Sequence, residues 1–166
     1  MSNSITVQGS DVVILGDITL TDFADGDVAE LEFPQDMINL KTCFDGNTIV
    51  AYNHSGKHAT LKVRVLRASG NDISLNNLII QSYADFVSTA PINGTITKTL
   101  GTGTASSSTI TSAYNTNPAT DKFNLYNGVI TKLPGSKTNT EGDLTQAVTE
   151  YLVKFGSATR TLTAGS

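Results

Sequence analysis

The sequence is poor in residues that cross-link a protein or anchor it in a membrane. Its 166 residues include one cysteine, Cys43, and no tryptophan. A single cysteine excludes an internal disulfide framework and fits synthesis in a reducing compartment. We expect Cys43 to be a small packing residue, because no histidine–asparagine or histidine–aspartate context flanks it. No apolar run of about 18 residues occurs and the start lacks a signal-peptide pattern, so we expect neither a membrane span nor an export signal.

Charged residues are also scarce, at 16% of the chain compared with about 25% in average proteins. Ser, Thr, Asn and Gly replace them, a mixture typical of strands and turns. Residues 1–45 hold nine acids and one base, a charge of −8, whereas residues 46–166 hold six acids and ten bases, a charge of +4. Solvated turns account for such a distribution, but an acidic part and a basic part would also attract each other in head-to-tail contacts.

The clearest pattern lies between residues 59 and 86. Apolar and polar residues alternate from Ala59 to Arg67, which predicts a strand with one buried face. Ser69 and Asp72 then resemble a capping box in which Asp replaces Glu or Gln. The apolar spacing that follows predicts one amphipathic helix over about residues 70–86. The buried face of this strand and helix is expected to contain Leu61, Val63, Val65, Leu75, Leu78, Ile79, Tyr83 and Phe86.

The rest of the chain reads mostly as short strands and turns, so we expect a single domain over residues 1–166. Residues 144–155 fit a helix or a strand, and their β-branched and aromatic residues favour the strand. Residues 101–120 are expected to form an exposed loop or a loosely paired hairpin around 109–114. Further strands are expected at 5–7, 12–15, 18–23, 28–33 with Pro34 at its end or at a sheet edge, 95–100, and 123–131 with a bulge or tight turn at Asn127-Gly128.

The turn Asp45-Gly46-Asn47 predicts a hairpin between residues 37–44 and 48–53. With the strand at 59–67, this hairpin is expected to form a three-stranded meander over residues 37–67. Both of its faces carry apolar side chains, and only one face is expected to pack on the core. The surplus would form an exposed apolar patch, which usually marks an interface. The expected interface residues are Asp36, Met37, Ile38, Leu40, Asp45, Gly46, Asn47 and Val50.

No catalytic, cofactor or metal-binding constellation emerges, so we do not expect an enzyme. The aspartates of residues 22–27 lack the spacing of a calcium loop. His54 and His58 are four residues apart, but the turn between them does not align two rings for zinc. The segments 101–103 and 135–138 lack the strand, helix and glycine context of a phosphate-binding loop.

Two stretches resemble the tail-tube proteins of contractile-tailed bacteriophages. They cover about half of the chain in the family's order, and none of their residues forms an active site. The first stretch comprises Gly16-Asp-Ile-Thr-Leu-Thr-Asp-Phe-Ala-Asp-Gly-Asp27, Glu32-Phe-Pro34, Asp45-Gly46-Asn47 and Val63-Arg-Val-Leu-Arg67. The second comprises Tyr126-Asn-Gly-Val129, Glu141-Gly-Asp143, Gln146-Ala-Val148, Lys154-Phe155 and Arg160.

The resemblance implies a mainly β fold, a β-barrel or sandwich of antiparallel strands with one flanking helix. It implies hexameric rings that stack head to tail into a tube, with the hairpin of residues 37–53 reaching the adjacent ring. The implied partners are the tail sheath protein, the baseplate and tail-terminator proteins and the tape-measure protein. Phage DNA would pass through without specific binding, since an acidic chain without basic clusters offers few phosphate partners. The implied location is the virion tail, assembled in the host cytoplasm.

Two alternatives stay open. A tube subunit of a phage-derived bacteriocin or secretion system is nearly indistinguishable from a phage subunit by sequence. A carbohydrate-binding β-sandwich or adhesin module belongs to a different class. Such a module would need aromatic residues in exposed loops, and the lack of tryptophan argues against it.

Overall fold

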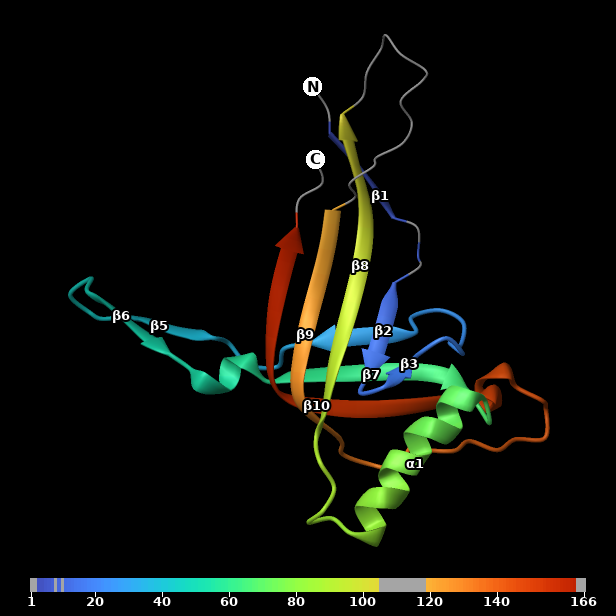
Figure 1. Cartoon of the computed structure of the whole chain (residues 1–166). Coiled ribbons are helices and arrows are strands. Elements are labelled where there is room, and N and C mark those ends of the chain that lie inside the picture. The colour runs from blue at the N-terminus through green and yellow to red at the C-terminus, as the bar shows by residue number, and fades with distance from the viewer. Residues whose placement is uncertain (1–2, 8, 10, 105–118, 164–166) are drawn as a thin grey trace.

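The structure is a computed structural model that describes residues 3–7, 9, 11–104 and 119–163. In this part of the chain, eight strands form one antiparallel sheet in the order β3-β2-β8-β9-β10-β7-β4, with β1 also paired to β8. The sheet curls into a half-barrel flanked by one α-helix (Figure 1), which confirms the expected mainly β class. The strands are β1 (Asn3–Val7), β2 (Val12–Leu15), β3 (Ile18–Thr19), β4 (Ala29–Glu32), β7 (Ala59–Leu66), β8 (Ile92–Thr104), β9 (Ala119–Ile130) and β10 (Val148–Thr163).

Strand β10 joins the two halves of this sheet. Its first part, from Val148 to Phe155, pairs with β7, and its residues from Val153 to Thr163 pair with β9. Figure 1 shows that β10 turns between these two partners and then runs beside β9, with β8 on the far side of β9. The sheet therefore curls at β10, because the first part of this long strand pairs with β7 and its later part, after the turn, pairs with β9.

The core lies along the face of β7 that the alternating pattern predicted. Leu61, Val63 and Val65 are fully buried, whereas the residues between them are partly or fully exposed. The helix α1 (Gly70–Ala84) covers this face with Leu75 and Ile79. The apolar residues with a spacing of two in β7 thus pack against those with helical spacing in α1, in one core.

The start of α1 is held by its own cap and by the sheet. Ser69 Oγ accepts a hydrogen bond from the backbone N–H of Asp72 (3.3 Å), which confirms the predicted cap. The Asp72 carboxylate accepts from the N–H of Ala68 (2.7 Å) and from the hydroxyl of Tyr151 (2.5 Å). Burial and this hydrogen bond raise the pKa of Tyr151 above its ordinary value. Asn71 adds a second link, since its Oδ1 accepts from the backbone N–H of Thr21 (2.7 Å).

The helix ends two residues before the expected end. Asp85 has extended backbone angles and caps the last turn at Ala84, with its N–H donating to the carbonyl of Gln81 (3.1 Å). Tyr83 and Phe86 were expected on the buried face but are 71% and 78% exposed. The buried part of α1 ends at Ile79, so the apolar spacing of the sequence continues past the last helical residue that packs in the core.

The predicted meander over residues 37–67 is wrong. Strands β5 (Ile38–Thr42) and β6 (Thr48–Tyr52) pair with each other in a separate two-stranded sheet, whereas β7 pairs with β4 and β10. A short 3-10 helix, η1 (His54–Lys57), follows β6 and redirects the chain. Both edges of β7 are occupied by strands from distant parts of the sequence, so no edge is free for β6.

Other expectations are confirmed or refined. The strand expected over residues 144–155 begins at Val148, after the 3-10 helix η2 (Leu144–Ala147). The bulge at Asn127-Gly128 is confirmed by a register shift against β8 and by the positive φ of 57° at Asn127. The strand before Pro34 is β4, at the end of the sheet's strand order. Residues 105–118, including the hairpin expected around 109–114, lie outside the described residues.

The outer part of the long strands carries one bidentate ion pair. Arg160 on β10 donates from Nε and Nη2 to the two carboxylate oxygens of Asp121 on β9, at 2.9 and 2.8 Å. The guanidinium carbon also lies 5.5 Å from the ring centre of Phe123. Arg160 holds the pKa of the Asp121 carboxyl below its usual value. Across the described ranges, we find no helix with the length and apolar content of a membrane span.

Candidate assembly interface

The hairpin β5–β6 is closed by hydrogen bonds within its own turn. The N–H of Cys43 donates to the carbonyl of Asn47 (2.7 Å), and the N–H of Gly46 donates to the carbonyl of Cys43 (3.0 Å). Gly46 has a φ of +87°, a backbone conformation that glycine adopts without strain. The Asp45 carboxylate accepts from the side-chain amide of Asn47 (2.7 Å). The Asp-Gly-Asn signal therefore forms the predicted turn.

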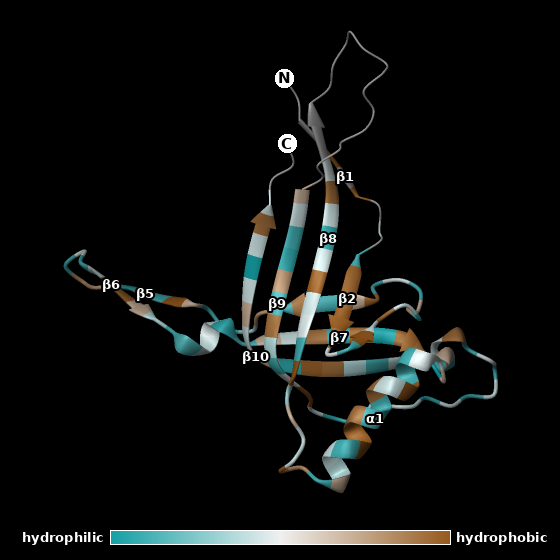
Figure 2. Cartoon of the chain, viewed as in Figure 1, coloured by the Kyte–Doolittle hydropathy of each residue, from teal (hydrophilic) through white to brown (hydrophobic). Residues whose placement is uncertain are grey.

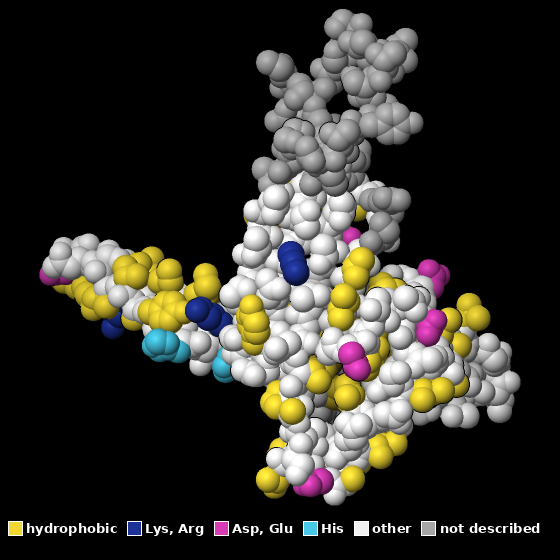
Figure 3. Space-filling view, viewed as in Figure 1, with side chains coloured by type: hydrophobic (Ala, Val, Ile, Leu, Met, Phe, Trp, Pro, Cys, Tyr) yellow, Lys and Arg dark blue, Asp and Glu magenta, His cyan; other side chains and the backbone are white. Residues whose placement is uncertain are grey.

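Neither face of this hairpin packs on the core. All ten residues of β5 and β6 are exposed, so the expectation that one face would be buried is wrong. Figure 1 shows the hairpin leaving the body sideways, and Figure 3 shows hydrophobic side chains gathered along it. Figure 2 shows the same arm as alternating apolar and polar bands. The exposed apolar side chains, between 53% and 110% exposed, are Met37, Ile38, Leu40, Phe44, Ile49, Val50 and Tyr52.

The structure brings the eight predicted interface residues onto this one arm. Asp36 and Met37 lie at its root, where their carbonyl oxygens accept hydrogen bonds from Asn53 at 2.9 and 2.8 Å. Ile38 and Leu40 lie on β5, with Leu40 opposite Val50 on β6. Asp45, Gly46 and Asn47 form the tip. That these residues contact another subunit remains a prediction.

Phe44 is a residue that the predicted interface omitted. It is fully exposed at the tip, beside Asp45. An aromatic residue next to a turn signal was visible in the sequence, but its burial depends on whether a core lies nearby. Because the arm points away from the body, Phe44 has no such cover.

The two histidines lie at the root of the arm and form no metal centre with other residues. The ring of His54 packs edge-on against Tyr52, with ring centres 4.9 Å apart. His58 is exposed at the end of η1. Within the described ranges, no three His, Cys, Asp or Glu side chains cluster in a way that would hold a metal ion.

A basic cavity lies on the outer face of β7 and β10. Arg64 and Glu150 line it from paired positions of these strands, on the side opposite the buried residues. The segment from Lys132 to Lys137 forms its other wall, and the cavity has a volume of about 520 Å³. Arg67 also lines it and donates from Nε to the carbonyl of Gln146 (2.7 Å). The expectation that the chain lacks basic clusters is therefore wrong, because the fold gathers bases that are far apart in the sequence.

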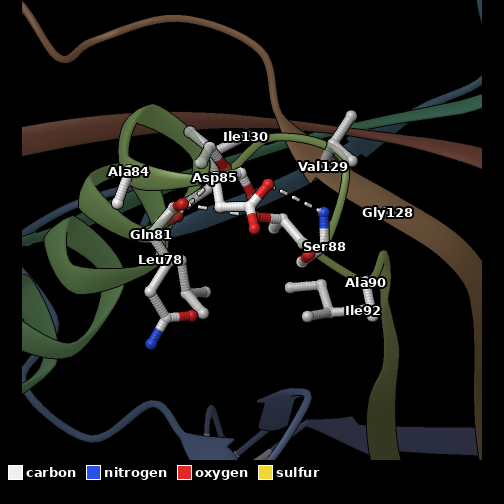
Figure 4. A pocket seen from close by; sticks show the side chains of 12 residues that line it. Leu78, Gln81, Ala84, Asp85, Ser88, Ala90, Ile92, Gly128, Val129 and Ile130 are labelled. Atoms are coloured by element: carbon white, nitrogen blue, oxygen red, sulfur yellow. Dashed lines mark hydrogen bonds between the residues drawn. The ribbon is translucent and has the colours of Figure 1, made fainter.

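A second cavity, of about 480 Å³, lies beneath the last turn of α1 (Figure 4). Its lining is mostly apolar and includes Leu78, Ile92 and Ile130. Its charged group is Asp85. Hydrogen bonding with the side chain of Ser88, and with its backbone N–H at 3.3 Å, lowers the pKa of the Asp85 carboxyl. The two cavities thus differ in charge, one basic and one acidic.

Comparison with known proteins gives similarity of fold. No family model and no curated protein matches the sequence. A chain of the tube-terminating cap of the anti-feeding prophage is similar over 95% of this chain and 92% of its own, with a TM-score of 0.58 and 12% identity. A chain of the sheath–tube complex of an extracellular contractile injection system, PVC, is similar over 92% and 88%, with a TM-score of 0.57 and 15% identity. A chain of the PVC sheath/tube terminator is similar over 94% and 96%, with a TM-score of 0.53 and 16% identity.

Proposed function

We propose that this chain is a structural subunit of the tube of a contractile particle, and that it acts by assembly without catalysis. Its subunits form hexameric rings, and the rings stack head to tail around a channel. The observation that carries this proposal is the projecting hairpin, whose apolar side chains are exposed in the described part of the subunit. Exposed apolar surface of this kind is costly in water and is typical of an interface.

The fold similarities support a role at the tube. The three similar structures are described as a tube-terminating cap, a sheath–tube complex and a sheath/tube terminator. In our proposal the chain likewise lies within a sheath and contacts a terminator at the end of the tube. A subunit that continues the tube must offer complementary surfaces at both ends of each ring, whereas a cap or terminator needs only one of them.

The phage form of this proposal rests on the sequence resemblance. In a phage tail the chain would surround DNA during ejection and contact the baseplate and the tape-measure protein. In a phage-derived bacteriocin or a secretion system, the same tube would carry another cargo. Capsid and terminase genes beside the gene for this chain would favour the phage form, and their absence would favour the second form.

Assembly of the purified protein tests the proposal. Light scattering after size-exclusion chromatography and negative-stain microscopy should reveal hexameric rings or tubes as concentration rises. Higher salt should weaken the contacts, because the acidic and basic parts of neighbouring subunits attract less when they are screened. Rings that never stack would indicate a cap or terminator. A strictly monomeric protein at all concentrations and salt levels would contradict the proposal.

A further inference from the structure

We propose that the hairpin tip of one subunit, with Phe44 and Asp45, docks in the basic cavity of a second copy of this chain. The inference rests on the proposed assembly and assigns two surfaces that meet in it. The contact pairs an aromatic ring and a carboxylate on one copy with an apolar floor and a basic rim on the other.

The tip offers an exposed aromatic ring and a carboxylate that is only partly satisfied by its own subunit. Phe44 is fully exposed, and the arm that carries it leaves the body, so the ring has no apolar partner among the residues that the structure describes. The Asp45 carboxylate accepts two hydrogen bonds from Asn47, at 3.2 and 2.7 Å. An ionised carboxylate has about four acceptor positions, so capacity for a cation remains.

The cavity offers the complementary groups. Leu133, Pro134 and Leu152 supply apolar surface, and Arg64, Lys132 and Lys137 supply positive charge. Among the described residues, neither ion pair, Lys98–Asp11 or Arg160–Asp121, uses a base of this cavity. Arg64 donates from Nη1 to the carbonyl of Asp25 (3.3 Å), and within the described part of the chain its positive charge has no acidic side chain as a partner in an ion pair. Glu150 is the acid in the lining, so the balance of charge is positive. At about 520 Å³ the cavity falls in the size range of sites that bury a small ligand, which is enough for one aromatic side chain.

The chemistry of the two surfaces favours this pairing over docking at the cavity beneath the end of α1. An arginine or lysine beside an aromatic ring attracts its face, and a desolvated carboxylate is stabilised by the same cations. The cavity beneath the end of α1 has apolar walls, but its charged group is Asp85, which would repel Asp45. Tip and basic cavity lie on different parts of the subunit, and in the proposed assembly each tip enters the cavity of the next copy, head to tail. Repetition of such a contact produces rings or filaments, whereas a reciprocal exchange of tips between two copies would stop at a two-fold dimer.

The native Cys43, next to Phe44, allows a direct test by cross-linking. The variant Leu133→Cys places a second thiol at the cavity, at an exposed position, and a short bismaleimide can join it to Cys43 of another copy. We expect a ladder of covalent multimers on a denaturing gel. The matched control is Asn77→Cys, which places the second thiol at an exposed position on α1. A second control is the wild-type chain, in which only two Cys43 residues could be cross-linked. Neither should produce the ladder.

A charge exchange tests the electrostatic part of the contact. Asp45→Lys should raise the concentration needed for assembly on the order of tenfold, because it places a cation against the basic rim. The double variant Lys132→Glu, Lys137→Glu should do the same, and the combination of all three changes should restore part of the loss. Asp85→Lys, at the other cavity, should leave assembly unchanged. The pairing would be overturned if Asp85→Lys weakened assembly as much as Asp45→Lys, or if the combined variant assembled no better than the Lys132→Glu, Lys137→Glu variant.

The outcomes separate this inference from the proposed function. A ladder together with rings or tubes supports both. Rings or tubes without a Leu133→Cys ladder, or with an equal ladder from Asn77→Cys, overturn the docking site and leave the tube proposal standing. A ladder without rings or tubes supports the docking site and contradicts the tube. Monomers without any ladder contradict both.

Discussion

The half-barrel body and the projecting hairpin use the same β-strand chemistry with opposite results. In the body, β7 buries every second residue completely on one face. In the hairpin, β5 and β6 are equally well paired, but all of their residues are exposed. Backbone pairing alone therefore does not bury apolar side chains, since a second layer must cover them. A two-stranded hairpin without such a layer is marginally stable in water, so we expect another chain to supply it.

The largest expected effect is on assembly and leaves the fold intact. Replacing Ile38, Leu40 and Val50 with Ser should abolish rings and tubes, because the apolar surface of the arm is lost. The unfolding midpoint of the body should stay close to that of the wild type, since these side chains touch no core residue. Microscopy and thermal unfolding together measure the two effects.

A matched control for this variant lies on α1, where Ile73 and Ile80 are as exposed as Ile38. Changing both to Ser should leave assembly intact. If the hairpin variant unfolds, the arm belongs to the body. If it still polymerises, the stacking surface lies elsewhere.

The same substitution at two positions compares the regions directly. Leu61→Ala in the body leaves a cavity at a fully buried site and should lower the free energy of unfolding by about 2–5 kcal/mol. Leu40→Ala in the hairpin should change it by less than about 0.5 kcal/mol. Urea unfolding curves of the two variants provide the measurement, and similar losses would show that the arm shares the stability of the core.

A smaller effect is expected where α1 is fastened to the sheet. Tyr151→Phe removes the hydroxyl that donates a hydrogen bond to the Asp72 carboxylate. The free energy of unfolding should fall by about 1–3 kcal/mol. The raised pKa of Tyr151 means that its hydroxyl stays protonated in the folded protein above pH 10, where the unfolded chain ionises. The wild type should therefore lose stability as pH rises above 10, and the variant should lose less. Identical pH profiles would contradict this account.

The smallest effect is expected at the ion pair on the outer strands. Asp121 has a lowered pKa, so its pairing with Arg160 stabilises the fold above the ordinary pKa of an aspartate and is lost as pH falls below it. Arg160→Gln should cause a small loss of stability at neutral pH, because the Arg160 side chain is 52% exposed and solvent screens the pair. Thermal unfolding of both proteins should give converging midpoints in acid, and a constant difference at all pH values would argue against the pair.

Local patterns predicted local structure well. The alternation around Leu61, the Ser69 cap and the Asp45-Gly46-Asn47 turn each depend on neighbours within a few residues, and each is present. The partners of β7 could not be predicted, because β4 and β10 come from distant parts of the chain and compete with the adjacent β6. The basic cavity was missed for the same reason, since Arg64 and Lys137 meet only after the sheet has formed.

The root of the hairpin depends on a glycine, Gly56, which packs closely against the first residues of the arm. A Cβ at Gly56 would lie 2.6 Å from the carbonyl oxygen of Asp36 and would collide with the backbone of Met37. The close packing of Gly56 against Asp36 and Met37 therefore helps to set the angle at which the arm leaves the body. A five-residue strand reaches about 17 Å, so a tilt of about 10° at the root moves the far end by about 3 Å. A methyl group at Gly56 would therefore force the backbone at the root of the arm to shift, and any change of angle there would displace the tip more than the root.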